Sequence, residues 1–299
     1  MCPMEFKQLQ SFVEVVRNRS FTKASQELFI SQPTVSMHIS QLESELGVRL
    51  IIRTTKSIEV TDLGRKLYEY AVNLLAMRDR MIANCSLQNR RILSLGASTI
   101  PSAYVLPRVL PEFGKKYPET YFVIHQSDSA GVMNGLLDGT YDLGLTGMAP
   151  DTDSLTAEVF FRDHIILVTP VNEHFLHLKE QGADAASILR AEPVILRESG
   201  SGSEKKAGEI LQKIGLPEES LHVAAQANDQ EAIKNMVAGG LGVSLISELA
   251  ASSYIAERRL ISFPLPDTVS SRALYLVYRT GYILQEELQI FMQFLKQHI

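Results

Sequence analysis

The stretch SFTKASQELFISQPTVSMHISQLESELGVRLIIRTTKSIEVTDLGRKLY, residues 20–68, decides the fold of the first part of the chain. Serine precedes two runs in it that favour helix: Ser20 stands before FTKASQEL, and Ser31 stands before QPTVSMHISQLESEL. A serine there accepts hydrogen bonds from free amides of the first helical turn, and proline is well tolerated inside that turn. Gly47 then ends the second helix. With an amphipathic helix over residues 4–17, three short helices are predicted in succession.

The helix that follows Ser31 has two faces of different character. Apolar residues recur at helical spacing and predict one buried stripe: Val35, Ile39, Leu42 and Leu46. The other face carries short, uncharged hydrogen-bonding side chains and has no acidic residue before Glu43. Such a face suits the major groove of DNA, where base edges offer donors and acceptors and carboxylates would repel phosphate. An ordinary solvated helix face is the alternative that this pattern leaves open.

Residues 48–60 and the segment after them predict a wing followed by a long helix. Apolar and polar residues alternate around Arg53-Thr54-Thr55-Lys56, which indicates a two-stranded ribbon with a basic tip. The helix begins at Thr61-Asp62 and carries apolar residues spaced by three and four: Leu63, Leu67, Tyr70, Leu74, Met77 and Met81. A stripe of this period favours the same helix of a second chain, so we expect a dimer. Packing on its own chain is the alternative.

Charge is distributed unevenly along the 299 residues. Residues 1–90 hold 12 Lys and Arg against 9 Asp and Glu, whereas residues 91–299 hold 17 against 25. A basic head on an acidic body is expected when only one domain meets phosphate. With 45% hydrophobic residues the chain can bury a large core, and the sequence holds no apolar run long enough to span a bilayer. Two cysteines are too few for a disulfide framework, and we expect a soluble, cytoplasmic protein.

From Ile92 onward, short apolar runs alternate with helical patterns, which predicts an α/β domain with parallel strands. The expected strands are 92–97, 120–126, 141–147, 163–170, 192–198, 221–227, 241–247 and 271–279, and the expected helices are 104–117, 129–138, 202–215, 229–238 and 284–297. This order predicts two α/β lobes joined by crossing strands, with a ligand-binding cleft between them.

Hydroxyl side chains recur where these predicted strands end, and small ligands bind at such ends in open α/β folds. The candidate effector-binding residues are Ser98, Thr99, Ser102, Ser129, Thr146, Ser199 and Ser201. Because no cluster of Lys or Arg accompanies them, we expect a small anion held by hydrogen bonds, either an inorganic oxyanion or a small carboxylate. For any single serine, a plain helix cap is the alternative.

Enzyme functions find little support in the same region. The Gly-Ser run at 199–203 lacks the lysine of a phosphate loop, no G-x-S-x-G turn occurs, and the histidines have no partners at metal-ligand spacing. We therefore expect no catalytic residues, no metal and no cofactor besides the small-molecule effector.

Residues 20–68 resemble the winged helix-turn-helix of LysR-type transcriptional regulators, in which an AA-x-x-L turn, SQP-x-VS, LE-x-x-LG, a basic wing and T-x-x-G follow in this order. Three positions depart from the pattern: Ser25 replaces the second alanine, Ile51 replaces phenylalanine, and Met37 stands where a basic residue is frequent. Methionine cannot make a bidentate contact to guanine, so readout at Met37 should be apolar.

The resemblance implies three parts of the chain. A winged helix-turn-helix DNA-binding domain would comprise residues 1–61, and a linker and dimerisation helix residues 62–90. A two-lobed, periplasmic-binding-protein-like effector domain would comprise residues 91–299. Its lobe I would be formed by about 91–162 with 266–299, and its lobe II by about 163–265.

The function implied is that of a cytoplasmic transcription factor that binds double-stranded DNA as a homodimer or homotetramer and responds to a small molecule. The expected DNA-contacting residues are Gln32, Pro33, Thr34, Ser36, Met37, Ser40, Arg53, Thr54 and Lys56. RNA polymerase would be a further partner of an activator, and no membrane is involved. The alternative is a solute-binding or metabolic α/β protein whose N-terminal helices serve only assembly.

Overall fold

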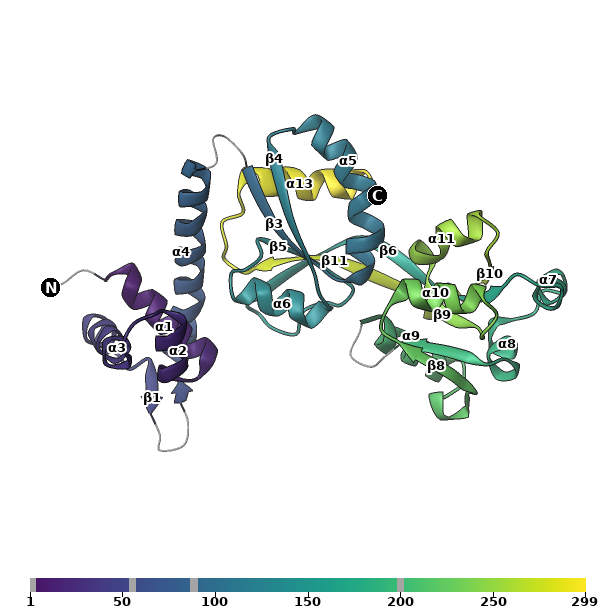
Figure 1. The fold of residues 1–299 in the computed structure, drawn as a ribbon, viewed down its shortest axis with the longest axis horizontal. Coiled ribbons are helices and arrows are strands. Elements are labelled where there is room, and N and C mark those ends of the chain that lie inside the picture. Colours follow the sequence, from purple (N-terminus) through teal and green to yellow (C-terminus); the bar gives the residue numbers. More distant parts are fainter. Residues whose placement is uncertain (1–3, 54–57, 87–90, 198–201) are drawn as a thin grey trace. The chain divides into compact units, whose positions relative to one another are not determined.

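The computed structural model divides the chain into two compact units (Figure 1). One contains residues 1–91 with 137–140, and the other contains residues 92–136 and 141–299. The structure describes the chain outside residues 1–3, 54–57, 87–90 and 198–201, and of residues 53, 80, 83–86 and 202–205 it describes the backbone alone.

The first unit is a small helical domain with a wing. Its elements are α1 (Phe6–Asn18), α2 (Phe21–Glu27), α3 (Gln32–Leu46), β1 (Ile51–Arg53), β2 (Ile58–Val60) and α4 (Asp62–Ser86). The predicted caps are confirmed, since the Ser20 and Ser31 side chains accept from the amides of Lys23 and Thr34 at 3.2 and 3.3 Å. The predicted ribbon is confirmed as well, because β1 and β2 pair antiparallel with Ile52 opposite Glu59.

The buried stripe of α3 is one residue shorter than its period predicts. Val35, Ile39 and Leu42 are buried, but Leu46 is 41% exposed, so its assignment to the stripe was wrong. The helix ends at Leu46 and the chain turns at Gly47 with a φ of +67°. The core of this unit is completed instead by Leu50 and Ile51, which follow the turn.

Two polar side chains join the end of α3 and the start of α4 to the wing. The buried carboxylate of Glu43 accepts from the amides of Leu50 and Ile51 at 2.8 and 3.1 Å. The Thr61 hydroxyl donates to the Arg49 carbonyl at 2.8 Å and accepts from the Gly64 amide at 2.9 Å. A Cβ atom at Gly64 would lie 2.3 Å from the Leu50 carbonyl oxygen, so only glycine permits this approach.

The second unit is a two-lobed α/β domain. Its elements, with the first strand starting at the unit boundary, are β3 (Arg91–Ala97), η1 (Pro101–Val105), α5 (Leu106–Lys116), β4 (Thr120–Gln126), α6 (Ser129–Leu137), β5 (Leu143–Thr146), β6 (Leu155–Pro170), α7 (Glu173–Glu180), α8 (Ala185–Ala191), β7 (Val194–Arg197), α9 (Gly202–Lys213), η2 (Glu218–Ser220), β8 (Val223–Ala227), α10 (Gln230–Ala238), β9 (Ser244–Ser247), α11 (Glu248–Ala256), β10 (Leu260–Phe263), α12 (Asp267–Ser270), β11 (Ser271–Arg279) and α13 (Glu286–Gln297). Each strand and helix predicted in this region is present, whereas α7, α8, α11, α12 and β10 were not predicted.

The expectation of parallel strands is only partly correct. The strands of the large sheet follow the order β10-β6-β11-β5-β3-β4, with β9 also paired to β6. β3 and β5 run parallel, as do β7 and β8, but β11 runs antiparallel to both β5 and β6. The reason is that β11 carries the chain back from lobe II to lobe I and therefore enters the sheet from the opposite end.

The long strand β6 connects the lobes. Its residues 155–164 pair with β11 in lobe I, and its residues 165–170 pair with β9 and β10 in lobe II. In lobe I, α5 and α13 cover one face of the sheet, where Phe113 and Phe291 meet edge to face. Lobe II has separate cores on the two faces of its sheet. The predicted two-lobed architecture with crossing strands is confirmed.

Candidate functional site

The first candidate surface is the exposed face of α3. Gln32, Pro33, Met37 and Ser40 are exposed, and Thr34 and Ser36 are half-buried. Within this face, the Gln32 amide donates to the Ser36 hydroxyl at 3.2 Å. Glu43, the first acidic residue of the helix, points into the core instead. The face is thus uncharged where it is exposed near the helix start, so no carboxylate there would repel phosphate and its polar side chains suit base edges in the major groove.

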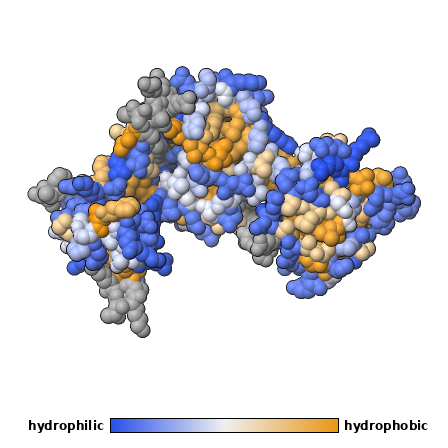
Figure 2. All heavy atoms as spheres, in the orientation of Figure 1, coloured by the Kyte–Doolittle hydropathy of each residue, from blue (hydrophilic) through white to orange (hydrophobic). Residues whose placement is uncertain are grey.

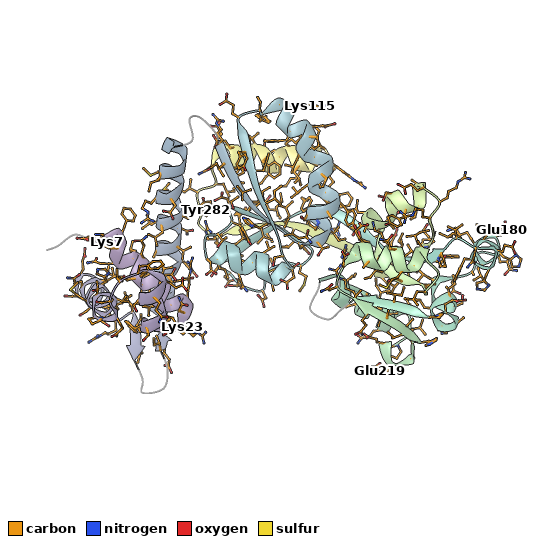
Figure 3. The ribbon with its side chains drawn as sticks, in the orientation of Figure 1. Lys7, Lys23, Lys115, Glu180, Glu219 and Tyr282 are labelled. Carbon is orange, nitrogen blue, oxygen red and sulfur yellow. The ribbon has the colours of Figure 1, made fainter. Side chains whose placement is uncertain are left out.

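Polar contacts to α1 hold α3 in one orientation. The Ser11 hydroxyl and His38 Nδ1 lie 2.7 Å apart, and the Gln8 amide donates to Gln41 Oε1 at 3.2 Å. These contacts flank the buried stripe of α3 and resist rotation of the helix about its axis. The exposed lysines Lys7 and Lys23 lie on the surface of the same unit (Figure 3).

The tip of the wing falls partly outside the described residues. Arg53 ends β1 and its backbone pairs with Ile58, but its side chain is not described. Thr54 and Lys56 lie outside the described residues altogether. Their contact with DNA therefore stays a prediction.

The apolar stripe of α4 is exposed along most of its length. Its side chains that are at least 43% exposed include Tyr70 (68%), Leu74 (43%), Met77 (52%) and Met81 (64%). Leu67 differs from them, because it packs against the core of its own unit. Figure 2 shows apolar side chains at the surface along this helix. The helix therefore has one face for its own domain and a second apolar face that the first unit does not bury.

A second candidate site lies at the junction of the two lobes, and lobe I contributes strand ends to it. The Ser98 amide donates to the Leu145 carbonyl at 2.8 Å, and the Ser127 amide donates to the Ala97 carbonyl at 3.1 Å. These bonds bring together the ends of β3 and β5 and the residue that follows β4. Ser98, Ser129 and Thr146 are buried there. The Thr146 hydroxyl is already used, since it donates to the Met148 carbonyl at 2.7 Å.

Thr99 is the predicted effector residue that contacts lobe II directly. Its hydroxyl accepts from Arg197 Nη2 at 3.3 Å, although the two residues are 98 positions apart. Ser102 follows on η1 and is half-buried. Ser199 and Ser201 lie outside the described residues, so their place at this junction stays a prediction.

Arg197 and Gln230 are the residues that the sequence-based prediction missed. Arg197 ends β7, and its Nη1 donates to Gln230 Oε1 at 2.8 Å. Gln230 begins α10 and is only 3% exposed. The available signal was a charged residue closing the apolar run VIL, two positions before the Gly-Ser segment that starts at Ser199. The sequence predicts no cluster of Lys or Arg at these hydroxyls, and the structure adds a single guanidinium, that of Arg197, beside Thr99.

Neighbouring charges set the electrostatics of this junction. Burial lowers the pKa of Arg197, and the positive charge of Arg272 lowers it further, while Asp229 acts in the opposite direction. Arg272 is itself buried and donates to Asp163 at 2.7 and 2.9 Å. Asp229 caps α10 by accepting from the amides of Glu231 and Ala232. Two free amides of that helix start are therefore already satisfied by a carboxylate.

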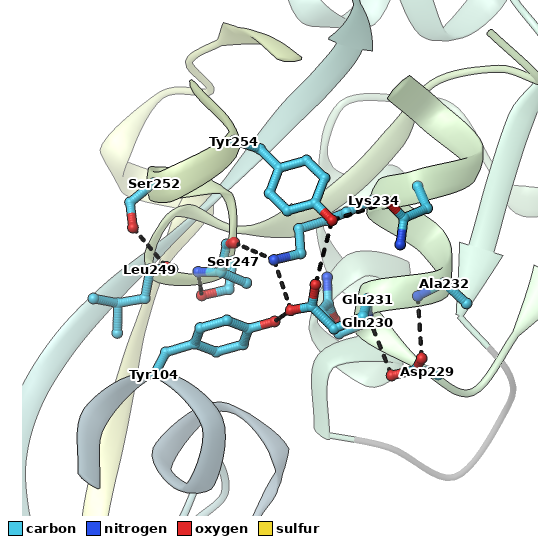
Figure 4. Close-up of polar contacts among 12 residues, drawn as sticks. Tyr104, Asp229, Gln230, Glu231, Ala232, Lys234, Ser247, Leu249, Ser252 and Tyr254 are labelled. Atoms are coloured by element: carbon cyan, nitrogen blue, oxygen red, sulfur yellow. Dashed lines mark hydrogen bonds and ion pairs between the residues drawn. The ribbon is translucent and has the colours of Figure 1, made fainter. Parts of the chain in front are cut away.

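A second polar cluster bridges the lobes next to this junction (Figure 4). The Tyr104 hydroxyl, from η1 of lobe I, donates to Glu231 Oε1 at 2.6 Å in lobe II. Lys234 is 1% exposed and lies 2.7 Å from the same carboxylate. Its ammonium group also donates to the Ala250 carbonyl and lies over the rings of Tyr104 and Tyr254. The cluster connects the lobes through a paired carboxylate.

This cluster predicts an acid-dependent contribution to stability. Burial acts to raise the pKa of Glu231, but hydrogen bonds from Lys234 and Tyr104 outweigh it and lower the pKa below its ordinary 4.5. A carboxyl with a lowered folded pKa stabilises the protein above its unfolded pKa and loses that contribution as pH falls through the folded value. We expect Glu231→Gln to destabilise the chain at neutral pH and to match the wild type at strongly acidic pH.

Urea unfolding across that pH range measures the effect. Glu180→Gln is the matched control, because Glu180 lies at the exposed end of α7 (Figure 3). A constant difference between wild type and Glu231→Gln at every pH would contradict the assignment of the lowered pKa to this carboxyl.

Metal and membrane sites find no support in the described parts of the chain. Among those residues, no group of three or more His, Cys, Asp or Glu side chains could hold a metal ion. No helix within the described ranges is both long and apolar enough to cross a membrane.

Comparison with known proteins gives consistent matches over most of the chain. Residues 6–65 match the bacterial regulatory helix-turn-helix protein of the lysR family, and residues 87–299 match the LysR substrate binding domain. The RuBisCO operon transcriptional regulator of Allochromatium vinosum is 28% identical over 295 residues, which cover 97% of this chain and 95% of that protein. The HTH-type transcriptional activator CmpR of Synechocystis is 29% identical over 300 residues, covering 97% and 94%.

Solved structures share the fold at lower sequence identity. A full-length OxyR variant from Pseudomonas aeruginosa superposes with a TM-score of 0.67 at 18% identity. The match covers 99% of this chain and 96% of that chain. The fold of this chain is therefore shared with that protein.

Proposed function

We propose, since this chain belongs to the LysR family of bacterial transcriptional regulators, that α3 and the wing read its operator while the lobe junction binds a compact anionic effector. The family consists of transcriptional regulators rather than enzymes, and its second domain binds small-molecule effectors. The observation that carries the DNA-reading part is the uncharged, exposed face of α3, held in place by the contacts of His38 and Gln41.

In this proposal, residues 1–61 bind DNA, residues 62–90 pair two chains, and residues 91–299 bind the effector. Gln32, Thr34, Ser36 and Met37 contact base edges, and Arg53 contacts phosphate. The regulator acts in the cytoplasm as a homodimer or homotetramer, and as an activator it would also contact RNA polymerase. No catalytic role is assigned to any residue.

Base readout predicts different losses on specific and random DNA. We expect Gln32→Ala to weaken binding to the operator by about 1–3 kcal/mol and binding to random duplex very little, because it removes a base contact alone. Arg53→Ala should weaken both and reduce the salt dependence by a slope of about 1, because it removes a phosphate contact. Gel-shift titrations on both DNAs at several salt concentrations measure these effects.

Two outcomes of that experiment would contradict the proposal. Equal losses on both DNAs for Gln32→Ala would remove α3 from base readout. If the wild type binds neither DNA at any salt concentration, the alternative in which the N-terminal helices serve only assembly is favoured.

The anionic class of effector is supported by the donors at the lobe junction. Hydroxyl side chains at the ends of β3 and β4 precede the helical segments η1 and α6, and the partial positive charge of a helix start stabilises anions. Arg197 adds a full positive charge next to Thr99. A large hydrophobic effector would find little apolar lining among these hydroxyl residues. A ligand that controls transcription must also bind the two states of the protein with different affinity.

A further inference from the structure

Arg197, Gln230 and Thr99 form a group of side chains in which buried donors are left without acceptors. Gln230 Oε1 accepts from Arg197 Nη1, and Thr99 Oγ1 accepts from Arg197 Nη2. Because a guanidinium has only donors, this contact fixes the orientation of the Gln230 amide. Its Nε2 group must then point away from Arg197 as a donor.

Two of these donors are buried without an acceptor. Gln230 Nε2 and Arg197 Nε make no hydrogen bond to the described part of the chain, and both atoms are shielded from solvent. A buried donor without an acceptor costs about 1–3 kcal/mol, so its retention needs an explanation. The Thr99 hydroxyl, whose oxygen already accepts, keeps its proton as a third donor. The two unsatisfied donors of lobe II, with the Thr99 hydroxyl of lobe I beside them, therefore suit a partner that offers acceptors.

A neutral carbonyl group and an anion both offer acceptors, and the positive charge of Arg197 favours the anion. The surrounding charges indicate how many charges this anion carries. Arg272 is neutralised by Asp163, and Lys234 is neutralised by Glu231. Among the described side chains this leaves Arg197 as the cation of the site, with the carboxylate of Asp229 acting on it electrostatically. A doubly charged oxyanion would meet one positive charge and a nearby negative charge, whereas a singly charged group is balanced by Arg197.

We infer that Arg197, Gln230 and Thr99 bind a single carboxylate group of the effector, with the guanidinium Nε and the amide Nε2 donating to its oxygens. This inference rests on the proposed anionic effector and narrows it to a monoanionic carboxylate. The same contacts couple binding to the lobes, because Thr99 lies on lobe I and the other two residues on lobe II. The carboxylate would then favour the arrangement in which the three donors meet.

Thermal unfolding of the full chain tests the inference, with acetate and pyruvate as carboxylate probes and with sulfate and chloride as matched salts. A ligand that binds only the folded state raises the unfolding temperature with its concentration. We expect acetate and pyruvate to stabilise the wild type more than sulfate or chloride does at equal ionic strength. Arg190→Gln, which removes an exposed arginine of lobe II, should behave like the wild type.

Variants of Arg197 and Gln230 separate the contribution of charge to carboxylate binding from that of hydrogen bonding. Arg197→Gln should abolish the stabilisation by carboxylates. Gln230→Met, which keeps the shape of the side chain, should weaken it about 10-fold or more through the loss of one charge-assisted hydrogen bond. Gln230→Glu places a carboxylate beside Arg197, so this variant should be more stable without any probe and should gain nothing from acetate.

The possible failures are distinguishable. Sulfate could raise the unfolding temperature more than either carboxylate does, and this effect could disappear in Arg197→Gln. That result would overturn the carboxylate assignment but would still agree with an anionic effector. Undiminished carboxylate binding in both Arg197→Gln and Gln230→Met would overturn the assignment of these residues. If no anion stabilises the chain, both the carboxylate assignment and the anionic effector fail, while the operator experiment with Gln32→Ala still decides DNA reading.

Discussion

Replacing Asp163 by alanine is expected to lower the free energy of unfolding of the full chain by about 3–5 kcal/mol. Asp163 lies on β6 where the strand passes between the lobes, and it is 2% exposed. Its Oδ2 accepts from Arg272 Nε and Nη2 at 2.9 and 2.7 Å and from the Ser247 hydroxyl at 2.7 Å. The variant leaves a buried guanidinium without its carboxylate, and this uncompensated charge is the main cost.

A double variant separates the cost of a broken pair from the value of the pair itself. Asp163→Leu with Arg272→Met removes both charges, and we expect it to recover a large part of the loss, because burying the two ions was itself costly. Asp151→Ala serves as the control, since this carboxylate is exposed and should change stability by less than about 0.5 kcal/mol. Urea unfolding followed by circular dichroism measures all three. A loss below about 1 kcal/mol for Asp163→Ala would show that the pair is not desolvated in solution.

Placing aspartates at Leu74 and Met77 is expected to lower operator affinity by about 10²- to 10⁴-fold. In the proposed dimer, two DNA-binding units joined through α4 would bind the second half of a palindrome intramolecularly, and this gain would be lost when the chains separate. Both side chains are about half exposed in the single chain, so charges there leave its own core intact. Leu67 is not a suitable target despite lying on the same stripe, because it packs on the core of its own unit.

The oligomeric state and the operator affinity should change together. Sedimentation gives the first and gel shift gives the second, and binding to a single half-site should remain. Ile283→Asp with Leu241→Asp is the control, since both are exposed apolar residues of the second unit. A Leu74→Asp, Met77→Asp protein that stays dimeric and binds the full palindrome like the wild type would exclude α4 as the contact between chains.

Local features of this fold could be predicted because they depend on residues a few positions apart. Ser20 and Ser31 act on amides three residues ahead, and the stripes of α3 and α4 follow from helical periodicity alone. Leu46 shows the limit of that reasoning. The helical period predicts that Leu46 is buried in the core. Leu46 is the last residue of α3, however, and its side chain is 41% exposed. The helices α7 and α8 were missed for a related reason, since short apolar runs give little periodic signal.

The sequence by itself therefore determined the order of the domains, the capped helices, the uncharged face of α3, and the hydroxyl residues at the strand ends. Only the tertiary structure decided which charged groups join those hydroxyls. Thr99, Arg197 and Gln230 meet because β6 and β11 connect the lobes, and no spacing along the chain encodes that meeting. Contacts between distant residues depend on strand order and register, which are set by the packing of the whole domain rather than by any local pattern.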